Sequence, residues 1–268
     1  IGNLGDITVR VIEILKSVDI IAAEDTRNTL KLLNHFEIKT PMTSYHQHNM
    51  DTKGPVLIEK LKDGKNIALV TDAGMPGISD PGEDMAKRCR QEGIPVTIAP
   101  GASAGISALV LSGMDARRYI FEGFLPTDKK ERQTVLKNLE KETRTTVFYE
   151  APHRLTDTLG VLLKAAGDRE ASTVREITKR YEEVKHGTLG SLLEYYKENP
   201  PKGEFVVIVG GMSESVLRQE EIDGWNSISI EEHMKKYTDE GMSEKEAMKK
   251  VAKDRGVSKR EIYAYLNR

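Results

Sequence analysis

Two glycine-rich loops contain the residues of this chain that are best suited to holding a ligand. The first has the sequence Asp-Ala-Gly-Met-Pro-Gly-Ile-Ser-Asp-Pro-Gly at positions 72–82, and the second, Ala-Pro-Gly-Ala-Ser-Ala-Gly, occupies positions 99–105. Glycine lets a backbone approach a ligand closely and adopt a positive φ, while proline holds the rest of a loop stiff. Because strand–glycine–helix turns also occur as simple connections, one such loop alone would not indicate a site.

The charges of the first loop favour a neutral or cationic ligand over a polyphosphate. The loop contains Asp72 and Asp80, and no lysine or arginine follows until Lys87. Neither loop has the Gly-Lys-Ser/Thr ending of a P-loop, and neither contains the G-x-G-x-x-G of a dinucleotide-binding turn. A sulfonium cofactor satisfies this description.

Both loops are predicted to follow buried strands of one sheet. Apolar, β-branched runs at 18–23, 67–71 and 94–98 are typical of such strands, and the apolar spacing between them predicts helices. Alternating helices and strands indicate a mostly parallel sheet with right-handed crossovers. Ligands bind beyond the carboxyl ends of such strands, beside a topological switch point, so the two loops should border one crevice.

A second α/β domain is expected at residues 116–212, after a first domain at 1–115. Its predicted strands cover 119–124, 145–149, 171–177 and 204–209, its predicted helices cover 128–141, 154–166 and 189–198, and residues 181–188 could add a hairpin arm. One continuous sheet would need more strands than open sheets usually carry without splitting. The predicted fold class is therefore α/β, with a mostly parallel first sheet and a mixed second sheet.

The C-terminal segment is predicted to be a small helical domain at residues 225–268, reached through a linker at 210–229. Gly256 suits the end of one helix and Ser258 suits the cap of the next, which is the helix-turn-helix pattern. Between positions 245 and 260 the chain has seven lysines and arginines against two acids. This local excess could bind phosphates, although a solvated basic face on a packing domain would have the same composition.

Composition excludes several other classes of protein. The 268 residues have a formal net charge of -2, which gives no general attraction to nucleic acids or membranes. The single cysteine, Cys89, excludes an internal disulfide framework and a multi-cysteine zinc site, and it suits a reducing cytoplasm. No apolar run approaches the ~20 residues of a membrane span, so we expect a cytoplasmic protein with neither a metal site nor a membrane partner.

Several motifs resemble those of one protein family. The loop at 72–82 resembles the central loop of the tetrapyrrole methylase superfamily. One branch of that superfamily methylates a ribose 2′-hydroxyl of a cytidine in small-subunit ribosomal RNA. The motifs similar to this branch are Ile-Gly-Asn-Leu-Gly-Asp-Ile-Thr at 1–8, Ala-Glu-Asp-Thr-Arg at 23–27, Ser-Tyr-His at 44–46 and Phe-Tyr-Glu-Ala-Pro-His-Arg at 148–154. The resemblance covers residues 1–211, and the C-terminal segment resembles the helix-turn-helix domain of the branch.

This resemblance implies that S-adenosylmethionine binds between the two α/β domains. The implied cofactor-binding residues are Asp72, Ala73, Gly74, Met75, Pro76, Gly77, Ile78, Ser79, Ser103, Ala104, Tyr149, Gly203 and Glu204. Family members carry a hydrophobic strand ending in Pro-Thr-Pro just ahead of the position of Ile1. We therefore expect that a strand forming the floor of the cofactor site is missing upstream of Ile1. The resemblance also implies a homodimer.

Methyl transfer from a sulfonium is an in-line displacement at carbon, which requires neither a metal nor a covalent intermediate. Alignment of the nucleophile and exclusion of water are the main contributions of such an enzyme, with alignment worth ~7–11 kcal/mol. A ribose hydroxyl is a poor nucleophile, so a group that accepts its proton should help. The candidates for this group are Glu24, Asp25, His46, Glu150, Glu176 and Lys179.

Each of these candidates also has an ordinary structural role, so the sequence selects none of them. Glu24 and Asp25 could cap a helix that starts near Thr26, and His46 could be a hydrogen-bonded loop histidine. Glu176 and Lys179 could form an ion pair, and Lys179 would accept a proton only if its pKa were depressed.

RNA is the expected partner, specifically the RNA of the small ribosomal subunit. Phosphate contacts are expected from exposed cations rather than from the residues that do proton chemistry. The candidates are Arg27, Arg154, Lys249, Lys253, Lys259 and Arg260. Two other functions remain open at this point, a methylase of a tetrapyrrole precursor and a non-catalytic RNA-binding factor on the same fold. The basic C-terminal segment and the motifs at 23–27 and 149–154 favour RNA methylation.

Overall fold

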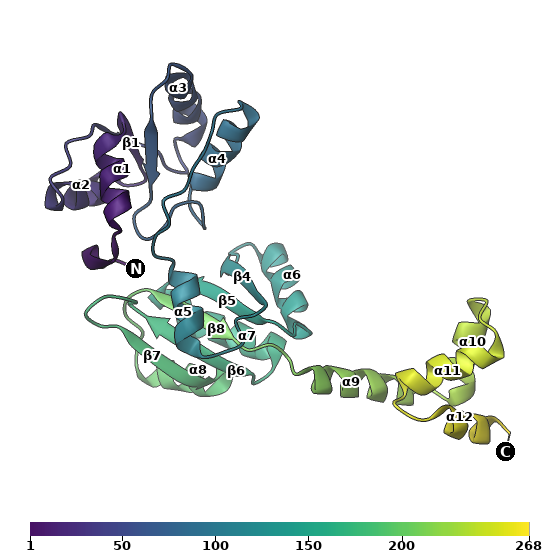
Figure 1. Cartoon of the computed structure of the whole chain (residues 1–268). Helices are drawn as coiled ribbons and strands as arrows, with labels where there is room; N and C mark the ends of the chain where they lie inside the picture. Colours follow the sequence, from purple (N-terminus) through teal and green to yellow (C-terminus); the bar gives the residue numbers. More distant parts are fainter. Residues whose placement is uncertain (268) are drawn as a thin grey trace. The chain divides into compact units, whose positions relative to one another are not determined.

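The computed structural model describes residues 1–267 and divides the chain into two compact units, whose elements are labelled in Figure 1. The first unit comprises Ile1–Glu140 and Thr145–Gly210, and the second comprises Lys141–Arg144 and the chain from Gly211 onward. The first unit contains two sheets, and the second contains helices. Within residues 1–267, no helix combines the length and the apolar character needed to cross a membrane.

The first sheet is parallel throughout and has helices on both faces, which confirms the sequence prediction. Its strand order is β2-β1-β3. Because successive side chains of a strand alternate between faces, Ile21 packs in the cluster with α1 and α2, and Ala22 packs in the cluster with α3 and α4. The elements are a 3₁₀ helix Leu4–Asp6, α1 Val9–Ser17, β1 Ile20–Ala23, α2 Thr26–His35, β2 Met42–Ser44, α3 Met50–Lys62, β3 Ile67–Val70 and α4 Gly82–Gln91. Strand β2 and helix α3 have no counterpart among the predicted elements.

The prediction of a strand at residues 94–98 is wrong. These residues belong to no helix or strand, and the side chains of Val96 and Ile98 are exposed. An extended segment becomes a strand only when a neighbouring strand accepts and donates its backbone hydrogen bonds. Strand β3 is the outermost strand on its side of the sheet, and no segment within residues 1–267 pairs with residues 94–98.

The second sheet is mixed, as predicted, with the strand order β4-β5-β8-β6-β7. Strand β4 is parallel to β5, and the remaining neighbours are antiparallel. The predicted hairpin arm at 181–188 is present, because β7 pairs with β6. The elements are α5 Ala104–Ser112, β4 Tyr119–Phe124, α6 Lys129–Glu140, β5 Thr145–Glu150, a 3₁₀ helix Pro152–Arg154, α7 Leu155–Ala166, β6 Glu170–Arg175, β7 Glu183–Thr188, α8 Leu189–Glu198 and β8 Phe205–Val209.

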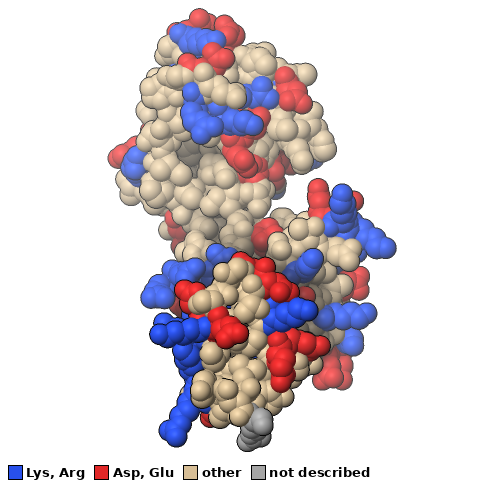
Figure 2. Space-filling model, turned by 90° about the vertical axis from the view of Figure 1, so that its right-hand side faces the viewer, with Lys and Arg blue, Asp and Glu red and all other residues tan. Residues whose placement is uncertain are grey.

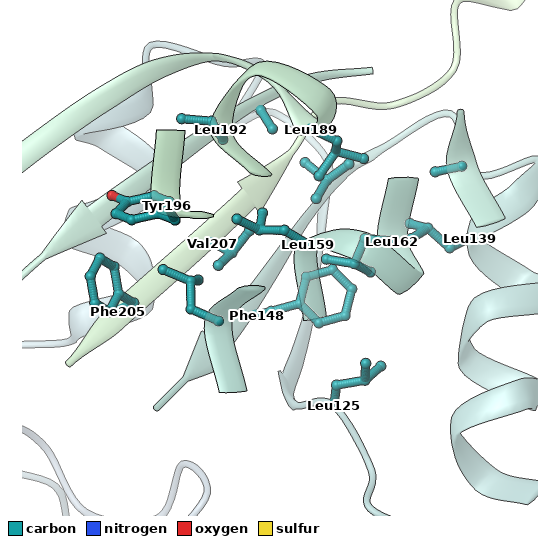
Figure 3. Packing of buried hydrophobic residues seen from close by; sticks show 14 residues of the cluster. Leu125, Leu139, Phe148, Leu159, Leu162, Leu189, Leu192, Tyr196, Phe205 and Val207 are labelled. Carbon is teal, nitrogen blue, oxygen red and sulfur yellow. The ribbon is translucent and has the colours of Figure 1, made fainter. Parts of the chain in front are cut away.

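The two faces of this sheet form separate cores. Figure 3 shows one of them, in which Phe148 and Val207 of the sheet pack against Leu159 and Leu162 of α7. The opposite face is covered by α5, whose Leu109 packs in a cluster with residues of β5, β6 and β8. Helix α5 lies within the range expected for the first domain, yet it packs on the second sheet.

The second unit consists of four helices among the described residues. They are α9 Glu214–Asn226, α10 Ile230–Asp239, α11 Glu244–Asp254 and α12 Lys259–Leu266. Ser229, Ser243 and Ser258 cap the last three helices, each in a reciprocal pair with a glutamate three residues later. The prediction of a linker at 210–229 is mostly wrong, because α9 occupies the greater part of this range.

A buried polar network explains why α9 is ordered. The ring of Trp225 stacks on His233, with centroids 3.9 Å apart and an interplanar angle of 6°. Arg255 donates through Nε to His233 Nδ1 at 3.2 Å, and through Nη2 to the carbonyls of Ile228 and Ser229. His233 is fully buried, so this network ties the end of α9 to α10 and to the end of α11.

The second unit should lose stability as the pH falls below about 6.5, the usual pKa of histidine. Burial and the nearby Arg255 guanidinium lower the pKa of His233, so the unfolded chain binds a proton more readily than the folded one. Trp225 is the only tryptophan of the chain, and its fluorescence therefore reports unfolding of this unit. We expect the urea midpoint followed by this fluorescence to fall between pH 8 and pH 5.5. The His233→Gln variant, whatever its absolute stability, should show no such fall, and an equal fall in both proteins would contradict the assignment.

Candidate functional site

The carboxyl ends of the three parallel strands bring acidic side chains from distant segments together. Glu24 follows β1 and Asp72 follows β3 by two residues. The Thr71 hydroxyl and the Asp72 backbone N–H both donate to Glu24 Oε2, at 2.7 and 3.3 Å. The Asp25 backbone N–H donates to Asp72 Oδ1 at 3.2 Å. These cross-strand hydrogen bonds hold the first glycine-rich loop against the end of β1.

A cavity of about 330 Å³ opens at this edge of the sheet. Three of the proton-acceptor candidates and one of the RNA-binding candidates line this cavity. The lining residues are Glu24, Asp25, Thr26, Arg27, Ser44, His46 and His48. The structure thus gathers residues that follow β1 with residues that end or follow β2.

Asp25 is the N-cap of α2 and a poor proton acceptor. Its carboxylate accepts the Arg27 backbone N–H at 2.8 Å and the Arg27 guanidinium at 3.1 and 2.7 Å. The hydrogen bonds from Arg27 lower the pKa of Asp25 to about 2. General-base catalysis is most efficient when the pKa lies near the working pH, so this carboxylate is poorly matched to the task.

His46 and Glu24 are the acceptor candidates that remain at the cavity. The backbone N–H of His46 donates to Asn49 Oδ1 at 2.9 Å. Its ring Nδ1 is buried and has no hydrogen-bond partner among residues 1–267. A buried polar atom without a partner is uncommon and costly, which marks this ring as one that a bound group or water would satisfy.

The first glycine-rich loop is held rigid by Asp80. The Asp80 carboxylate accepts the backbone N–H groups of Gly77, Ile78 and Gly82, at distances from 2.7 to 3.3 Å. Gly74 has a φ of +79°, and a Cβ at this position would lie 2.8 Å from the carbonyl oxygen of Ala102. Only glycine avoids this overlap and adopts this φ without strain.

The two glycine-rich loops contact each other, and the second sheet contacts both. The Met75 N–H donates to the Ala102 carbonyl at 2.8 Å. The Gly105 N–H, at the start of α5, donates to the Tyr149 hydroxyl at 3.1 Å. Burial raises the pKa of Tyr149, so its hydroxyl stays protonated at neutral pH. Tyr149 thereby joins β5 to the second loop.

Glu176 and Lys179 lie in a separate cluster with Glu204. The Lys179 ammonium donates to Glu176 Oε1 at 3.1 Å and to Glu204 Oε2 at 2.8 Å. Burial alone would lower the pKa of Lys179, but the two carboxylates raise it above its usual value. The ammonium therefore keeps its proton, and the condition under which Lys179 could act as a base is not met.

This cluster adjoins a second cavity of about 410 Å³, which is lined in part by the second loop. Thr178 lines the cavity, has a φ of +66° and accepts the Gly2 N–H through Oγ1 at 3.2 Å. The other lining residues are Ile1, Asp6, Thr8, Pro100, Gly101, Ala102 and Ser107. The cavity thus lies between segments of both α/β halves of the first unit.

Glu150 and Arg154 have structural partners. The Glu150 side chain is fully buried and accepts the Thr158 hydroxyl at 2.6 Å and the Ala151 N–H at 2.8 Å. Arg154 lies 3.5 Å from Glu150 through Nε and donates to the Leu125 carbonyl at 2.7 Å through Nη2. A carboxylate in this position orients the start of α7 and is inaccessible to a substrate.

Comparison with known proteins identifies the family. Residues 1–193 match the family model of the Tetrapyrrole (Corrin/Porphyrin) Methylases. The chain belongs to the tetrapyrrole methylase family. This match includes both glycine-rich loops, both sheets except for β8, and the first half of α8.

Relatives of this methylase are similar over nearly the whole chain. It is 47% identical to a protein of Bacillus subtilis over 263 residues, which are 98% of this chain and 90% of that protein. It is 49% identical to a protein of Halalkalibacterium halodurans with the same coverage, and 43% identical to one of Synechocystis over 98% of this chain and 93% of that protein. All three relatives are named "Ribosomal RNA small subunit methyltransferase I".

Two solved structures share the fold. A diphthine synthase matches with a TM-score of 0.63 and 17% identity, over 79% of this chain and 86% of that one. The uroporphyrin-III-C-methyltransferase of Thermus thermophilus matches with a TM-score of 0.55 and 19% identity, over 78% and 90%. At these identities the likeness shows the fold alone.

Several residues around the candidate site were not predicted from the sequence. Asn28 donates to Asp72 Oδ2 at 3.4 Å, and His48 lines the first cavity. Strand β4 has a bulge at Gly123, where a Cβ would lie 3.1 Å from the hydroxyl of Ser79. A glycine inside a predicted strand is a signal for a bulge or a close approach, and it could have drawn attention to Gly123.

Substitution of Gly74 by alanine should disorder both loops, because the new Cβ would overlap the Ala102 carbonyl. Gly64 provides a matched control, since its φ is +85° but no atom lies within 4 Å of the added Cβ. Both variants should lose about 1–2 kcal/mol of stability from the positive φ. Only Gly74→Ala should increase the hydrogen-exchange rates at residues 72–82 and 99–105. Equal exchange in the two variants would show that the contact between the loops does not order them.

Proposed function

We propose that this protein transfers a methyl group from S-adenosylmethionine to the ribose 2′-hydroxyl of a cytidine in small-subunit ribosomal RNA. The observation that carries the substrate is the 47–49% identity, over 90% of their length, to relatives whose name specifies small-subunit ribosomal RNA. The proposal that the target is the 2′-hydroxyl of a cytidine rests on the motifs at 23–27 and 148–154.

The residues of the two loops fit the cofactor. We place it against Asp72–Ser79, Ser103 and Ala104, with Tyr149, Gly203 and Glu204 supplied by the second sheet. The absence of a side chain at Gly74 lets the two loops pack directly against each other, and the acidic Asp72 suits a cationic ligand. In the described residues, the backbone N–H groups of Gly101 and Ala102 donate to no protein acceptor, so they are available to a ligand.

The protein's contribution to the reaction is positioning and removal of a proton. When bound, the cofactor supplies a methyl group on a positively charged sulfur. Transfer of this methyl group to the ribose oxygen would require a protein group to accept the proton of the hydroxyl. Glu24 and His46 line the cavity beside Asp72, where either side chain can receive this proton. The rigid loop would hold the methyl donor in one alignment, an effect worth up to ~7–11 kcal/mol of the barrier.

RNA contacts are proposed at both units. The Arg27 side chain is 86% exposed at the first cavity, and Lys249, Lys253, Lys259 and Arg260 are exposed on α11 and α12. Arg255 is buried in its own network, which leaves six of the seven basic residues between 245 and 260 for phosphates. Both signs of charge are interspersed over the face drawn in Figure 2, so recognition depends on such local groups.

A homodimer is supported by the exposed apolar face of α5. This helix has apolar residues all around it, and only one face packs on the second sheet. Ile106, Val110 and Leu111 stay exposed, with Val110 at 70%. A second copy would cover this face. We place the protein in the cytoplasm, where its proposed substrate is assembled.

The protein should methylate small ribosomal subunits taken from cells that lack it. The expected product is 2′-O-methylcytidine, detected by mass spectrometry of the digested RNA, and a porphyrinogen should receive no methyl group. Methylation of the porphyrinogen alone would replace the RNA assignment with a tetrapyrrole one. Calorimetry that shows subunit binding but no S-adenosylmethionine binding would indicate a non-catalytic RNA-binding factor.

Removal of the proton acceptor should lower kcat by about 10²–10⁴-fold while cofactor binding is unchanged. The variants are Glu24→Gln and His46→Gln, and Ser44→Ala is the control because it lines the same cavity without titrating near neutral pH. We expect one of the two variants to show this loss in single-turnover measurements. If both retain the wild-type rate, the proton leaves directly to water and neither residue is the acceptor.

A further inference from the structure

An exposed aromatic ring stands at the carboxyl end of strand β4, next to the proposed cofactor loops. Phe124 is the last residue of this strand, and 51% of its surface is exposed. The following residue, Leu125, is fully buried in the core of the second sheet. The core of the second sheet therefore reaches this end of β4. A lack of buried space nearby does not explain why the Phe124 ring is exposed.

A β-bulge places Phe124 on the same face of the sheet as Tyr149. In the pairing of β4 with β5, Phe121 lies opposite Val147, whereas Phe124 lies opposite Tyr149, so one extra residue is present on β4. In a regular strand, residues three apart point to opposite faces. The bulge, with Gly123 at a φ of +71°, puts both phenylalanines on the face of Tyr149. Bulges of this kind often re-aim a side chain beside an active site.

Tyr149 supports the Phe124 ring from one side. The two ring centroids are 5.7 Å apart in an edge-to-face arrangement, and Phe121 holds Tyr149 in a similar contact at 5.0 Å. Tyr149 is itself fixed through its hydroxyl by the Gly105 N–H. Phe124 is therefore an exposed ring on a rigid base.

The position of Phe124 relates it to both glycine-rich loops. Its neighbour Gly123 approaches Ser79 of the first loop so closely that a Cβ would lie 3.1 Å from the Ser79 hydroxyl. Its supporting ring, Tyr149, contacts the start of α5 directly after the second loop. A ligand held by these loops would lie near the ring.

The chemistry of the proposed substrate gives this ring a use. Single nucleotides of an RNA are recognised mainly in loops, bulges and ends, where an unstacked base stacks on aromatic side chains. This stacking is worth ~1–3 kcal/mol per base. A single exposed ring is far too small for a protein interface, which typically buries ~800 Å² per partner.

We propose that Phe124 is the platform on which the base of the target nucleotide stacks while its ribose is methylated. This inference rests on the proposed function, because it concerns the RNA substrate of the same site. It assigns to Phe124 a role in substrate binding that is independent of the proton acceptor at the first cavity.

The test compares Phe124→Leu, which removes the aromatic face, with Phe124→Tyr, which keeps it. The expected loss for Phe124→Leu is about 5–150-fold in kcat/KM for methylation of small ribosomal subunits, the fold-change that corresponds to one stacked base. Phe124→Tyr should stay within a few fold of wild type, and the affinity for S-adenosylmethionine should be unchanged in both. Tyr119→Leu is the matched control, since Tyr119 is 38% exposed at the other end of β4 and should be dispensable.

Each other outcome overturns the inference in a recognisable way. Wild-type kcat/KM in Phe124→Leu means that no base stacks there, and the proposed function then stands without it. Weaker cofactor binding in Phe124→Leu means that the ring serves the adenine of the cofactor. An altered mass by light scattering in Phe124→Leu alone means that the ring contacts a second copy. If the unsubstituted protein methylates no subunits, the proposed function fails, and this inference fails with it.

Discussion

The parallel pairing of β1 with both β2 and β3 is the constraint on which the rest of the site depends. Since the strands run in the same direction, the residues that follow them meet at one edge. Glu24, His46 and Asp72 come from widely separated positions in the chain, yet hydrogen bonds between neighbouring strand ends hold this edge together. A slip of one strand by one residue would move each of its side chains to the opposite face and separate these groups.

The second sheet completes the site through a few close contacts. Tyr149 reaches the start of α5, and Gly123 lies against Ser79, so both glycine-rich loops have a partner on this sheet. A rigid loop loses little entropy when it binds, which suits a cofactor that must be held in one alignment. The bulge that brings Gly123 close to the loop also determines where Phe124 points.

The helical unit is a small domain with few apolar residues, so its stability depends on more than an apolar core. Its core includes a buried histidine and a buried arginine: Arg255 donates to His233 Nδ1 and to two backbone carbonyls, the His233 ring stacks on Trp225, and His233 Nε2 lies 3.5 Å from Asp254 Oδ2. Polar groups in such a core cost free energy unless they are paired, so the network also specifies how the helices meet. The lysines of α11 and α12 do not take part in this buried network, and their side chains are exposed.

Features that depend on local physical chemistry could be predicted from the amino-acid sequence. The α/β class, the cap at Asp25, the turn at Gly256 and the two rigid loops all follow from residue types and spacing. Tertiary structure alone decided the rest, because those features depend on neighbours that are distant in the chain. Residues 94–98 have strand-forming side chains but no pairing strand, and α9 is ordered because Trp225 stacks on His233. Lys179 keeps its proton because two carboxylates lie beside it, and Phe124 lies on the face of Tyr149 because a bulge shifts its register against β5.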